Sequence, residues 1–391
     1  MSKSKLNLIL LPLSWIYGII VGFRNMFFNI ELLPSESFDL PVISIGNITV
    51  GGTGKTPHAE YLIRLLSKDY QVAVLSRGYK RKSKGFLLAK TNSTLADLGD
   101  EPLQMKKKFS NLVVAVDGNR RRGIHQLMDE SMLPSVDIIL LDDAFQHRYV
   151  NPSISILLID YSRMLSDDHL LPAGKLREPA RQMKRADIVI VTKCPDKLRP
   201  IDIRILTMKI KLQNHQNLYF TTMKYGELKA MVPTTPNIGN SSPQDEIFDD
   251  IENTVSNPVN NDLTMNQIRN NHLPVLVLTG IASPESLINY VRSFSPEVQT
   301  MIYPDHHEFG KKEARRITQA FEKIKPEGGV IITTEKDVMR IQNNPHMERL
   351  IPYIYYPDLL IHFLEEEGSV FEQKILDYVR INKRNSGLAT G

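Results

Sequence analysis

A short apolar segment that runs directly into a glycine-rich turn constrains the fold of this chain more than any other feature. Residues 42–50 are rich in Val and Ile, and they lead into the turn Gly51-Gly52-Thr53-Gly54-Lys55-Thr56. Glycines let backbone amides wrap around phosphate oxygens, Lys55 supplies a positive charge for the terminal phosphates, and Thr56 offers a hydroxyl to Mg²⁺. The amphipathic stretch from His58 predicts a helix whose positive N-terminus adds to the site. The segment therefore predicts a strand, a phosphate loop and a helix that together bind a nucleoside triphosphate.

The loop departs from the standard phosphate-loop pattern at its first position, where Thr49 stands in place of glycine. It also departs from the variant loop of membrane-bound partition ATPases, which has lysine where this chain has Val50. A glycine-rich turn that binds nothing is the alternative interpretation. The strand before the turn and the helix after it favour nucleotide binding, because a phosphate loop requires that context. The predicted nucleotide contacts are Thr49, Gly51, Gly52, Thr53, Gly54, Lys55 and Thr56.

The composition narrows the class of protein. At 391 residues the chain is long enough for two domains and a substantial core. The net charge of +4 is mild and no basic stripe is interleaved with aromatic residues, so nucleic acid is a poor candidate partner. The single cysteine, Cys194, excludes internal disulfides and fits a reducing compartment. The sequence gives no sign of an obligatory protein partner.

The N-terminal 30 residues have a different character. Two lysines precede an uncharged run from Leu6 to Phe23, which contains Trp15 and Tyr17. At about 1.5 Å per residue, a helix of this length could just cross a hydrocarbon core. A signal peptide and a buried core helix are the alternatives, but no small-residue cleavage site follows the run. We expect residues 1–30 to form a membrane-associated helix that either spans the bilayer or lies in its interface, with the rest of the chain in the cytoplasm.

Short apolar segments alternate with helical or loop segments along the first half of the chain. They are rich in Val, Ile and Leu, which predicts strands buried on both faces. Alternation with helices predicts a doubly wound, mostly parallel α/β sheet of the phosphate-loop NTPase type. The predicted strands are 41–45, 71–75, 111–116, 137–141, 154–159 and 187–192.

A second, smaller α/β domain is predicted after a polar segment. Residues 234–271 are rich in Asn, Pro, Ser and Asp, which is typical of a flexible insertion. Beyond it we expect strands at 273–278, 298–303, 329–334 and 353–356, and helices at 284–294 and 311–323. The predicted organisation is an N-terminal helix (1–30), a phosphate-loop core (31–224), a linker with the insertion (225–272), the smaller domain (273–383) and a loose tail (384–391).

Two pairs of acidic residues could support phosphoryl chemistry. Asp142 and Asp143 follow an apolar segment, at the place where an acidic residue completes the Mg²⁺ site of phosphate-loop folds. Acidic pairs also end many ordinary strands, so this role depends on the phosphate loop upstream. Asp100 and Glu101 precede a proline in a turn. A carboxylate there could accept the proton of a hydroxyl group, or it could only cap a helix.

Three further segments carry polar side chains whose role the pattern leaves open. Residues 303–309 contain His306 and His307, but no third ligand cluster supports a zinc site there. The basic segments 120–122 and 175–179 could clamp phosphates or could be solvated surface. Residues 191–195 are similar to a guanine-reading loop, yet Pro195 occupies the position of its aspartate, so adenine is the default base.

Taken in order, these segments resemble the tetraacyldisaccharide 4′-kinase family, the lipid A 4′-kinases. The resemblance rests on a series of motifs that covers most of the chain from residue 41 to residue 337. They are SIGN (44–47), the phosphate loop, SRGY (76–79), GDEP (99–102), LDDAFQH (141–147), LPAGKLREP (171–179), TGIA (279–282), PDHH (304–307) and TTEKD (333–337). This chain departs from the family at Ala144, where glycine is usual, and in a longer polar insertion before Leu273.

The resemblance implies an ATP-dependent lipid kinase. Such an enzyme transfers the γ-phosphate to the 4′-hydroxyl of a tetraacyl glucosamine disaccharide 1-phosphate, a lipid A precursor in the inner-membrane leaflet. It implies ATP and Mg²⁺ as cofactors and Lys55 as a catalytic residue. Asp100 is implied as the proton acceptor and His306 as its partner from the second domain, with His307 as the fallback.

The resemblance also implies the remaining contacts. The Mg²⁺ ligands would be Thr56, Asp142 and Asp143. The candidates for substrate contacts are Arg120, Gln146, His147, Arg177 and Glu178. Two other classes stay open from the residues alone, a membrane-docked partitioning NTPase and a non-catalytic scaffold with a decayed nucleotide site. Val50 argues against the first, and the intact Lys55 and acidic pair argue against the second.

Overall fold

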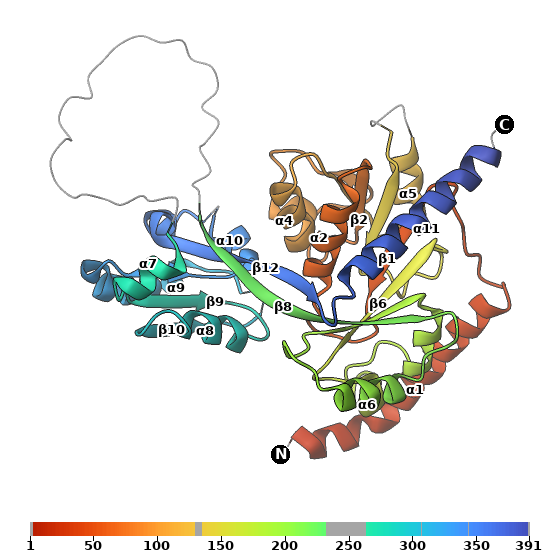
Figure 1. Cartoon of the computed structure of the whole chain (residues 1–391), viewed down its shortest axis with the longest axis horizontal. Coiled ribbons are helices and arrows are strands. Elements are labelled where there is room, and N and C mark those ends of the chain that lie inside the picture. The colour runs from red at the N-terminus through yellow and green to blue at the C-terminus, as the bar shows by residue number, and fades with distance from the viewer. Residues whose placement is uncertain (1–2, 130–134, 232–262, 306, 343, 390–391) are drawn as a thin grey trace, which may run out of the picture. The chain divides into compact units, whose positions relative to one another are not determined.

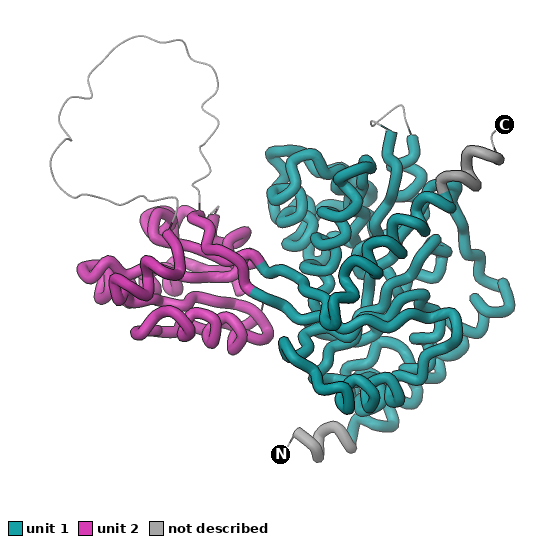
Figure 2. Tube along the Cα trace, viewed as in Figure 1, with its two compact units in different colours: residues 1–224, 359–391 teal, residues 225–358 magenta. Residues whose placement is uncertain are grey.

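The computed structural model describes residues 3–129, 135–231, 263–305, 307–342 and 344–389. The chain forms two compact units (Figure 2). The larger unit contains residues 1–224 together with 359–391, and the smaller unit contains residues 225–358. The chain passes between the units along two strands, β8 (Asn217–Ala230) and β12 (Ile354–Phe363).

The larger unit is built on a parallel sheet. Its strands follow the order β8-β7-β6-β1-β5-β2-β4-β3, and the neighbours pair in parallel except for the antiparallel pair β3–β4. This arrangement confirms the predicted doubly wound α/β fold. The strands are β1 (Val42–Gly46), β2 (Val72–Ser76), β3 (Leu87–Leu88), β4 (Val113–Val116), β5 (Ile138–Asp142), β6 (Ile154–Asp160), β7 (Ile188–Thr192) and β8.

Helices cover both faces of this sheet because its strands are apolar on both sides. Alternate residues of β1 enter different clusters: Ile43 and Ile45 pack with helices on one face, and Val42 packs on the other. The first face carries α2 (Lys55–Leu66), α4 (Asp100–Lys108) and α11 (Gly368–Ala389), and the second carries α5 (Arg120–Met128) and α6 (Pro200–Ile210) (Figure 1). The short helix α3 (Leu95–Leu98) precedes α4.

The end of the chain differs from the prediction, which placed residues up to 383 in the smaller domain and left 384–391 as a loose tail. The chain returns to the larger unit at Leu359, and α11 continues to Ala389. Phe371, Ile375 and Val379 recur at helical spacing and belong to the core cluster that contains α2. Burial of this apolar stripe is the physical reason why the segment is a packed helix.

Phe371→Ala is expected to lower the free energy of unfolding by about 3–5 kcal/mol. The Phe371 side chain is 1% exposed and its ring stacks on Phe363 with a centroid separation of 4.6 Å. Val370, the preceding residue on the same helix, is 61% exposed, so Val370→Ala is the matched control and should change stability little. Urea unfolding followed by circular dichroism measures both, and equal midpoints would contradict the assignment of α11 to the core.

The smaller unit is a parallel α/β layer. Its strands follow the order β10-β9-β11-β12, with β9 at Val275–Thr279, β10 at Val298–Ile302 and β11 at Val330–Ile332. Its core combines β9 and β11 with the helix α8. The helices are α7 (Met265–Asn270), α8 (Glu285–Arg292), α9 (Lys311–Ile324) and α10 (Glu335–Ile341).

The predicted linker at residues 225–272 contains ordered elements at both ends. Strand β8 extends to Ala230, and α7 begins at Met265 with Thr264 as its N-cap. The sequence did not indicate β8 because Lys224, Gly226 and Glu227 interrupt its apolar pattern. Residues 232–262, which hold most of the predicted insertion, lie outside the described residues.

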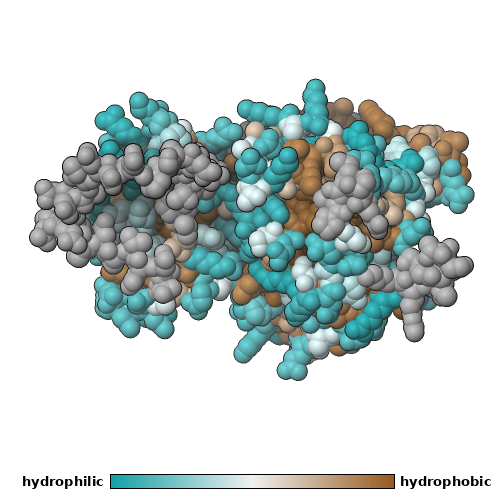
Figure 3. Space-filling view, turned by 90° about the horizontal axis from the view of Figure 1, so that it is seen from above, coloured by the Kyte–Doolittle hydropathy of each residue, from teal (hydrophilic) through white to brown (hydrophobic). Residues whose placement is uncertain are grey.

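The N-terminal helix α1 (Lys3–Asn29) belongs to the larger unit (Figure 1). Residues 9–29 form a helix that is long and apolar enough to cross a membrane. Its apolar side chains are exposed, and Trp15 has 69% of its surface accessible. Its buried side chains include the polar residues Ser14 and Asn25, which is the reverse of a soluble amphipathic helix. Figure 3 shows a different face of the molecule, on which brown hydrophobic surface of the larger unit lies between teal hydrophilic areas.

Candidate active site

The predicted phosphate loop lies at the carboxyl edge of the sheet, between β1 and α2. Strand β1 ends at Gly46, and α2 begins at Lys55 with Gly54 as its N-cap. Gly54 has a φ of +84°, a conformation that glycine adopts without the strain a side chain would add. The N-terminus of α2 therefore opens onto the loop, where its free amides can bind phosphate oxygens.

Hydrogen bonds from residues at or just after the ends of β1 and β7 hold the loop in shape. The side-chain amide of Asn47 donates to the Thr53 hydroxyl at 2.8 Å and to the Thr49 hydroxyl at 3.3 Å. The hydroxyl of Thr192, at the end of β7, donates to the Thr53 carbonyl at 2.9 Å. Lys193 donates to the Gly52 carbonyl. The predicted contact Thr49 is thus a buried part of the loop scaffold.

The segment around Leu176 runs beside the phosphate loop and is hydrogen-bonded to it. Thr49 and Leu176 make an isolated antiparallel bridge, in which the Val50 amide donates to the Lys175 carbonyl at 2.7 Å. The Arg177 amide donates to the Ile48 carbonyl at 2.8 Å. Two predicted site segments that are more than 120 residues apart in the sequence are therefore joined backbone to backbone.

Asp143 connects three of the predicted site residues. Its carboxylate lies 3.5 Å from the Lys55 ammonium and accepts hydrogen bonds from the Arg177 guanidinium at 3.1 and 3.2 Å. Burial alone would raise the pKa of Asp143, but the charges of Lys55 and Arg177 lower it below its ordinary value. Asp143 is therefore ionised at neutral pH, and it holds Lys55 beside the loop.

Asp142, the last residue of β5, is buried and has an unsatisfied oxygen. Its Oδ2 accepts a hydrogen bond from the Ser76 hydroxyl at 3.3 Å, while its Oδ1 has no hydrogen-bond partner among the described residues. Burial raises its pKa to about 6, and the negative charges of Asp143 and Glu101 add to the increase. A buried carboxylate of this kind gains from a cation placed against the free oxygen.

The residues present fit a Mg²⁺ ion. The Asp142 oxygen is a hard ligand and Thr56, buried at the first turn of α2, offers a hydroxyl. No cluster of three or more His, Cys, Asp and Glu side chains arranged for a metal occurs in the described part of the chain.

Two of the predicted substrate contacts are buried structural groups in this structure. The Arg120 guanidinium donates to the Asp142 carbonyl at 3.1 Å and to the Asp117 carbonyl, and burial lowers its pKa to about 10. Glu178 accepts from Arg185 and lies 3.8 Å from Arg24. The contacts of Arg120 position the turn at Asp142 and Asp143, and those of Glu178 position the segment 170–178. Any contact of either residue with substrate stays a prediction.

The other predicted substrate contacts lie around the loop. Gln146 donates to the Asn47 carbonyl and accepts from Arg177 at 3.4 Å. His147 is half-buried, and burial together with the nearby Arg120 and Arg77 charges lowers its pKa to about 4. His147 is therefore neutral at physiological pH, so it can serve as a hydrogen-bonding group but not as a cation.

Asp100 is the first residue of α4, directly after Gly99. Gly99 has a φ of +86°, and a β-carbon there would lie 2.6 Å from the Tyr79 carbonyl oxygen, so the turn requires glycine. The buried Glu60 of α2 fixes α4 beside the phosphate-loop helix. It accepts from the Gln104 amide at 2.8 Å and pairs with Lys108 at 2.7 Å.

In the smaller unit, His306 lies outside the described residues, so its pairing with Asp100 stays a prediction. The neighbouring His307 stacks on Tyr303 with a centroid separation of 4.8 Å, and it meets the Phe309 ring edge to face at 5.5 Å. Its Nε2 is buried and has no hydrogen-bond partner in the described part of the chain. These contacts give His307 a packing role within its own unit.

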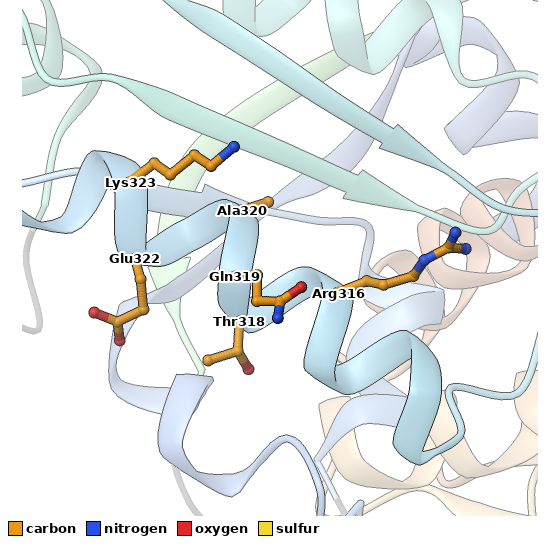
Figure 4. A pocket seen from close by; sticks show the side chains of 6 residues that line it. All are labelled: Arg316, Thr318, Gln319, Ala320, Glu322 and Lys323. Atoms are coloured by element: carbon orange, nitrogen blue, oxygen red, sulfur yellow. The ribbon is translucent and has the colours of Figure 1, made fainter.

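The buried carboxylate of Asp337 joins two motifs of the smaller unit. It accepts from the Gly280 amide at 3.0 Å, from the Thr334 hydroxyl at 2.7 Å and from Arg340 at 3.1 Å. The segments 279–282 and 333–337 are therefore parts of one scaffold. A pocket of 570 Å³ elsewhere in this unit is lined only by α9 side chains, Arg316, Thr318, Gln319, Ala320, Glu322 and Lys323 (Figure 4), and it contains none of the predicted site residues.

Sequence reasoning missed several groups that shape the site. Asn47, Ser76 and Lys193 contact the loop or Asp142, and Glu60 fixes α4. The first three stand in segments that the sequence singled out, so their position at strand ends was the available signal. Nothing in the sequence alone indicated the distant pairing of Glu60 with Gln104.

Comparisons with known proteins point to one family. A family model described as tetraacyldisaccharide-1-P 4′-kinase (LpxK) matches residues 6–380. A tetraacyldisaccharide 4′-kinase from Phocaeicola vulgatus is 46% identical over 387 residues, which cover 98% of each chain. One from Bacteroides thetaiotaomicron is 45% identical over 386 residues, covering 98% of this chain and 96% of the relative.

A solved structure supports the same relationship. LpxK from Aquifex aeolicus in complex with ATP is similar with a TM-score of 0.68 and 25% identity, covering 96% of this chain and 99% of that one. The resemblance predicted from the ordered motifs is confirmed by a match that includes both units. The chain belongs to the tetraacyldisaccharide-1-P 4′-kinase family.

Proposed function

We propose that this chain transfers the γ-phosphate of ATP to the 4′-hydroxyl of a tetraacyl glucosamine disaccharide 1-phosphate, a step of lipid A biosynthesis. The observation that carries the proposal is the arrangement of Lys55, Asp142 and Asp143 around a phosphate loop, in a chain that matches this kinase family over nearly its whole length. Phosphoryl transfer depends on positioning and charge neutralisation, and these residues supply both.

The roles follow from the chemistry of each group. Lys55 and the amides at the start of α2 bind the phosphates, and Asp143 keeps Lys55 in place. Asp100 accepts the proton of the acceptor hydroxyl, and His306 assists it. Thr56 and Asp142 would hold Mg²⁺, with Asp143 as the third predicted ligand, and the ion would neutralise charge on the phosphates.

The test is a direct assay. Purified protein is incubated with γ-labelled ATP, Mg²⁺ and the disaccharide 1-phosphate lipid in detergent, and the lipid fraction is examined for label. The proposal expects labelled lipid only when acceptor and protein are both present. Release of phosphate without dependence on the lipid would favour the partitioning NTPase, and the absence of both products would favour the inactive scaffold.

The position of α1 suggests how the protein meets a lipid acceptor. The side of α1 that bears Ser14, Tyr17 and Asn25 is hydrogen-bonded to the larger unit, and the opposite apolar side is exposed. A helix bound to a folded unit along one side cannot be surrounded by lipid. We therefore propose that α1 lies in the interface of the inner membrane, with the two units in the cytoplasm where ATP is available.

Ile16→Ser is expected to weaken binding to lipid vesicles by about 10- to 100-fold, because it removes one apolar side chain from the membrane. Ile16 is 56% exposed on α1, and Ile302, which is 53% exposed on β10, is the matched control. Co-sedimentation with vesicles of phosphatidylethanolamine and phosphatidylglycerol measures both variants. Equal losses in Ile16→Ser and Ile302→Ser would contradict an interface formed by α1.

A further inference from the structure

The polar side of α1 is bonded to a segment that also touches the nucleotide loop. Ser14 donates to the Leu170 carbonyl at 2.9 Å and accepts from the Ala173 amide at 2.9 Å. The Tyr17 hydroxyl donates to the Arg177 carbonyl at 2.8 Å. An apolar membrane helix needs none of these bonds for anchoring, so they indicate a second role for this side of α1.

Arg177 is the residue at which the contacts converge. Its carbonyl accepts from Tyr17, its amide donates to the Ile48 carbonyl at 2.8 Å, and its guanidinium binds Asp143 at 3.1 Å. Asp143 in turn lies 3.5 Å from the Lys55 ammonium. A displacement of α1 is therefore transmitted to both the backbone of the phosphate loop and the charge that holds Lys55.

A second path runs from α1 to the other end of the loop. Arg24 donates to the Gln146 carbonyl at 2.9 Å, and the Gln146 side chain donates to the Asn47 carbonyl. Asn47 fixes Thr53 within the loop at 2.8 Å. Both ends of the loop thus depend on segments that α1 holds, while the exposed side of the same helix is the surface available to lipid.

From this we propose that α1 couples membrane binding to nucleotide binding, with Tyr17 as the positioning residue that links the helix to the phosphate loop. The inference rests on the proposed interfacial position of α1. Binding of α1 to a bilayer selects one placement of the helix, and that placement orders the segment 170–178 against the loop. Vesicles then tighten nucleotide binding, and by linkage the nucleotide tightens vesicle binding by the same factor.

The experiment measures this factor in the full-length chain without any acceptor lipid. The affinity for a fluorescent, non-hydrolysable ATP analogue with Mg²⁺ is determined with and without saturating phosphatidylethanolamine and phosphatidylglycerol vesicles. The affinity for vesicles is determined with and without the analogue. The wild-type chain is expected to give the same factor from both measurements, of about 5- to 150-fold.

Tyr17→Phe removes only the hydroxyl that donates to the Arg177 carbonyl. We expect the coupling factor to fall towards one, while vesicle affinity without the analogue is unchanged. Tyr149→Phe is the matched control, because Tyr149 packs edge to face on Phe28 of α1 at 4.9 Å and its ring is kept. Ser14→Ala breaks the link at Leu170 and should act like Tyr17→Phe if the first variant is unstable.

A purely structural role of Tyr17 would lower the melting temperature of the variant and leave its coupling factor at the wild-type value, which would overturn the inference. A wild-type factor of one, with vesicle binding intact, would overturn it as well. The kinase assay in detergent is independent of this result. Labelled lipid without coupling would refute only the inference, and coupling without labelled lipid would refute only the kinase.

Discussion

Lys55→Met is expected to lower the turnover number of phosphoryl transfer by about 10²–10³-fold, the loss typical when one preorganised positive group is removed from a transition state. Lys55 is the first residue of α2, directly after the phosphate loop, and its ammonium lies 3.5 Å from the Asp143 carboxylate. Methionine keeps the length of the side chain and removes the charge. The measurement is the rate of label transfer to the lipid acceptor at saturating ATP.

The fold should survive this change, because Asp143 retains its hydrogen bonds from Arg177. Lys68→Met is the matched control, since Lys68 is exposed just after the other end of α2. We expect the control to keep wild-type turnover and both variants to keep the wild-type melting temperature. Turnover of Lys55→Met at the level of the control would show that the γ-phosphate does not meet this lysine.

The sheet could be predicted from the sequence because its strands are buried on both faces. Segments such as 138–141 and 188–191 are continuous runs of apolar residues, and such runs have few other stable structures. Strand β8 could not be predicted in the same way, because its C-terminal half is half-exposed and carries Lys224, Gly226 and Glu227. Helix α11 was missed because its partner, α2, ends at Leu66 and so lies more than 300 residues earlier in the chain.

The site was predictable to the extent that its residues stand at strand ends. The phosphate loop follows β1 and the acidic pair stands at the end of β5, and these two strands are neighbours in the sheet with Ile45 opposite Asp142. The direction of each side chain was not predictable. Arg120 and Glu178 are buried and bind protein groups, which their motifs did not indicate, and their contact with substrate stays a prediction. Motif membership cannot distinguish a ligand contact from the scaffold behind it.

The N-terminal helix shows the same limit. Its apolar run predicted a membrane helix, because most of its side chains are apolar and uncharged. Ser14 and Tyr17 also lie within this run, and the pattern alone gave neither side chain a partner. In the structure they face the protein and form the bonds to the segment beside the nucleotide loop. The role of the polar side of α1 became visible only from its contacts with Leu170 and Arg177, which are far from α1 in the sequence.

Asp100→Asn is expected to lower the turnover number by about 10²–10⁴-fold, the contribution of a general base, without weakening the affinity for ATP. Asp100 begins α4, and Glu60 fixes that helix against α2 through Gln104 and Lys108. The amide of asparagine keeps the shape of the side chain but cannot accept the proton of the acceptor hydroxyl. Steady-state label transfer and titration with the fluorescent ATP analogue measure the two quantities separately.

Asp202→Asn is the control for this substitution. Asp202 is also an acidic residue in the first turn of a helix of the larger unit, so its loss reproduces the effect of a changed helix N-terminus. We expect Asp202→Asn to keep wild-type turnover. If Asp100→Asn also kept it, Asp100 would not be the base. If Asp100→Asn instead lost ATP affinity in proportion to turnover, the carboxylate would serve the nucleotide rather than the acceptor, since a base acting on the acceptor hydroxyl has no part in binding ATP.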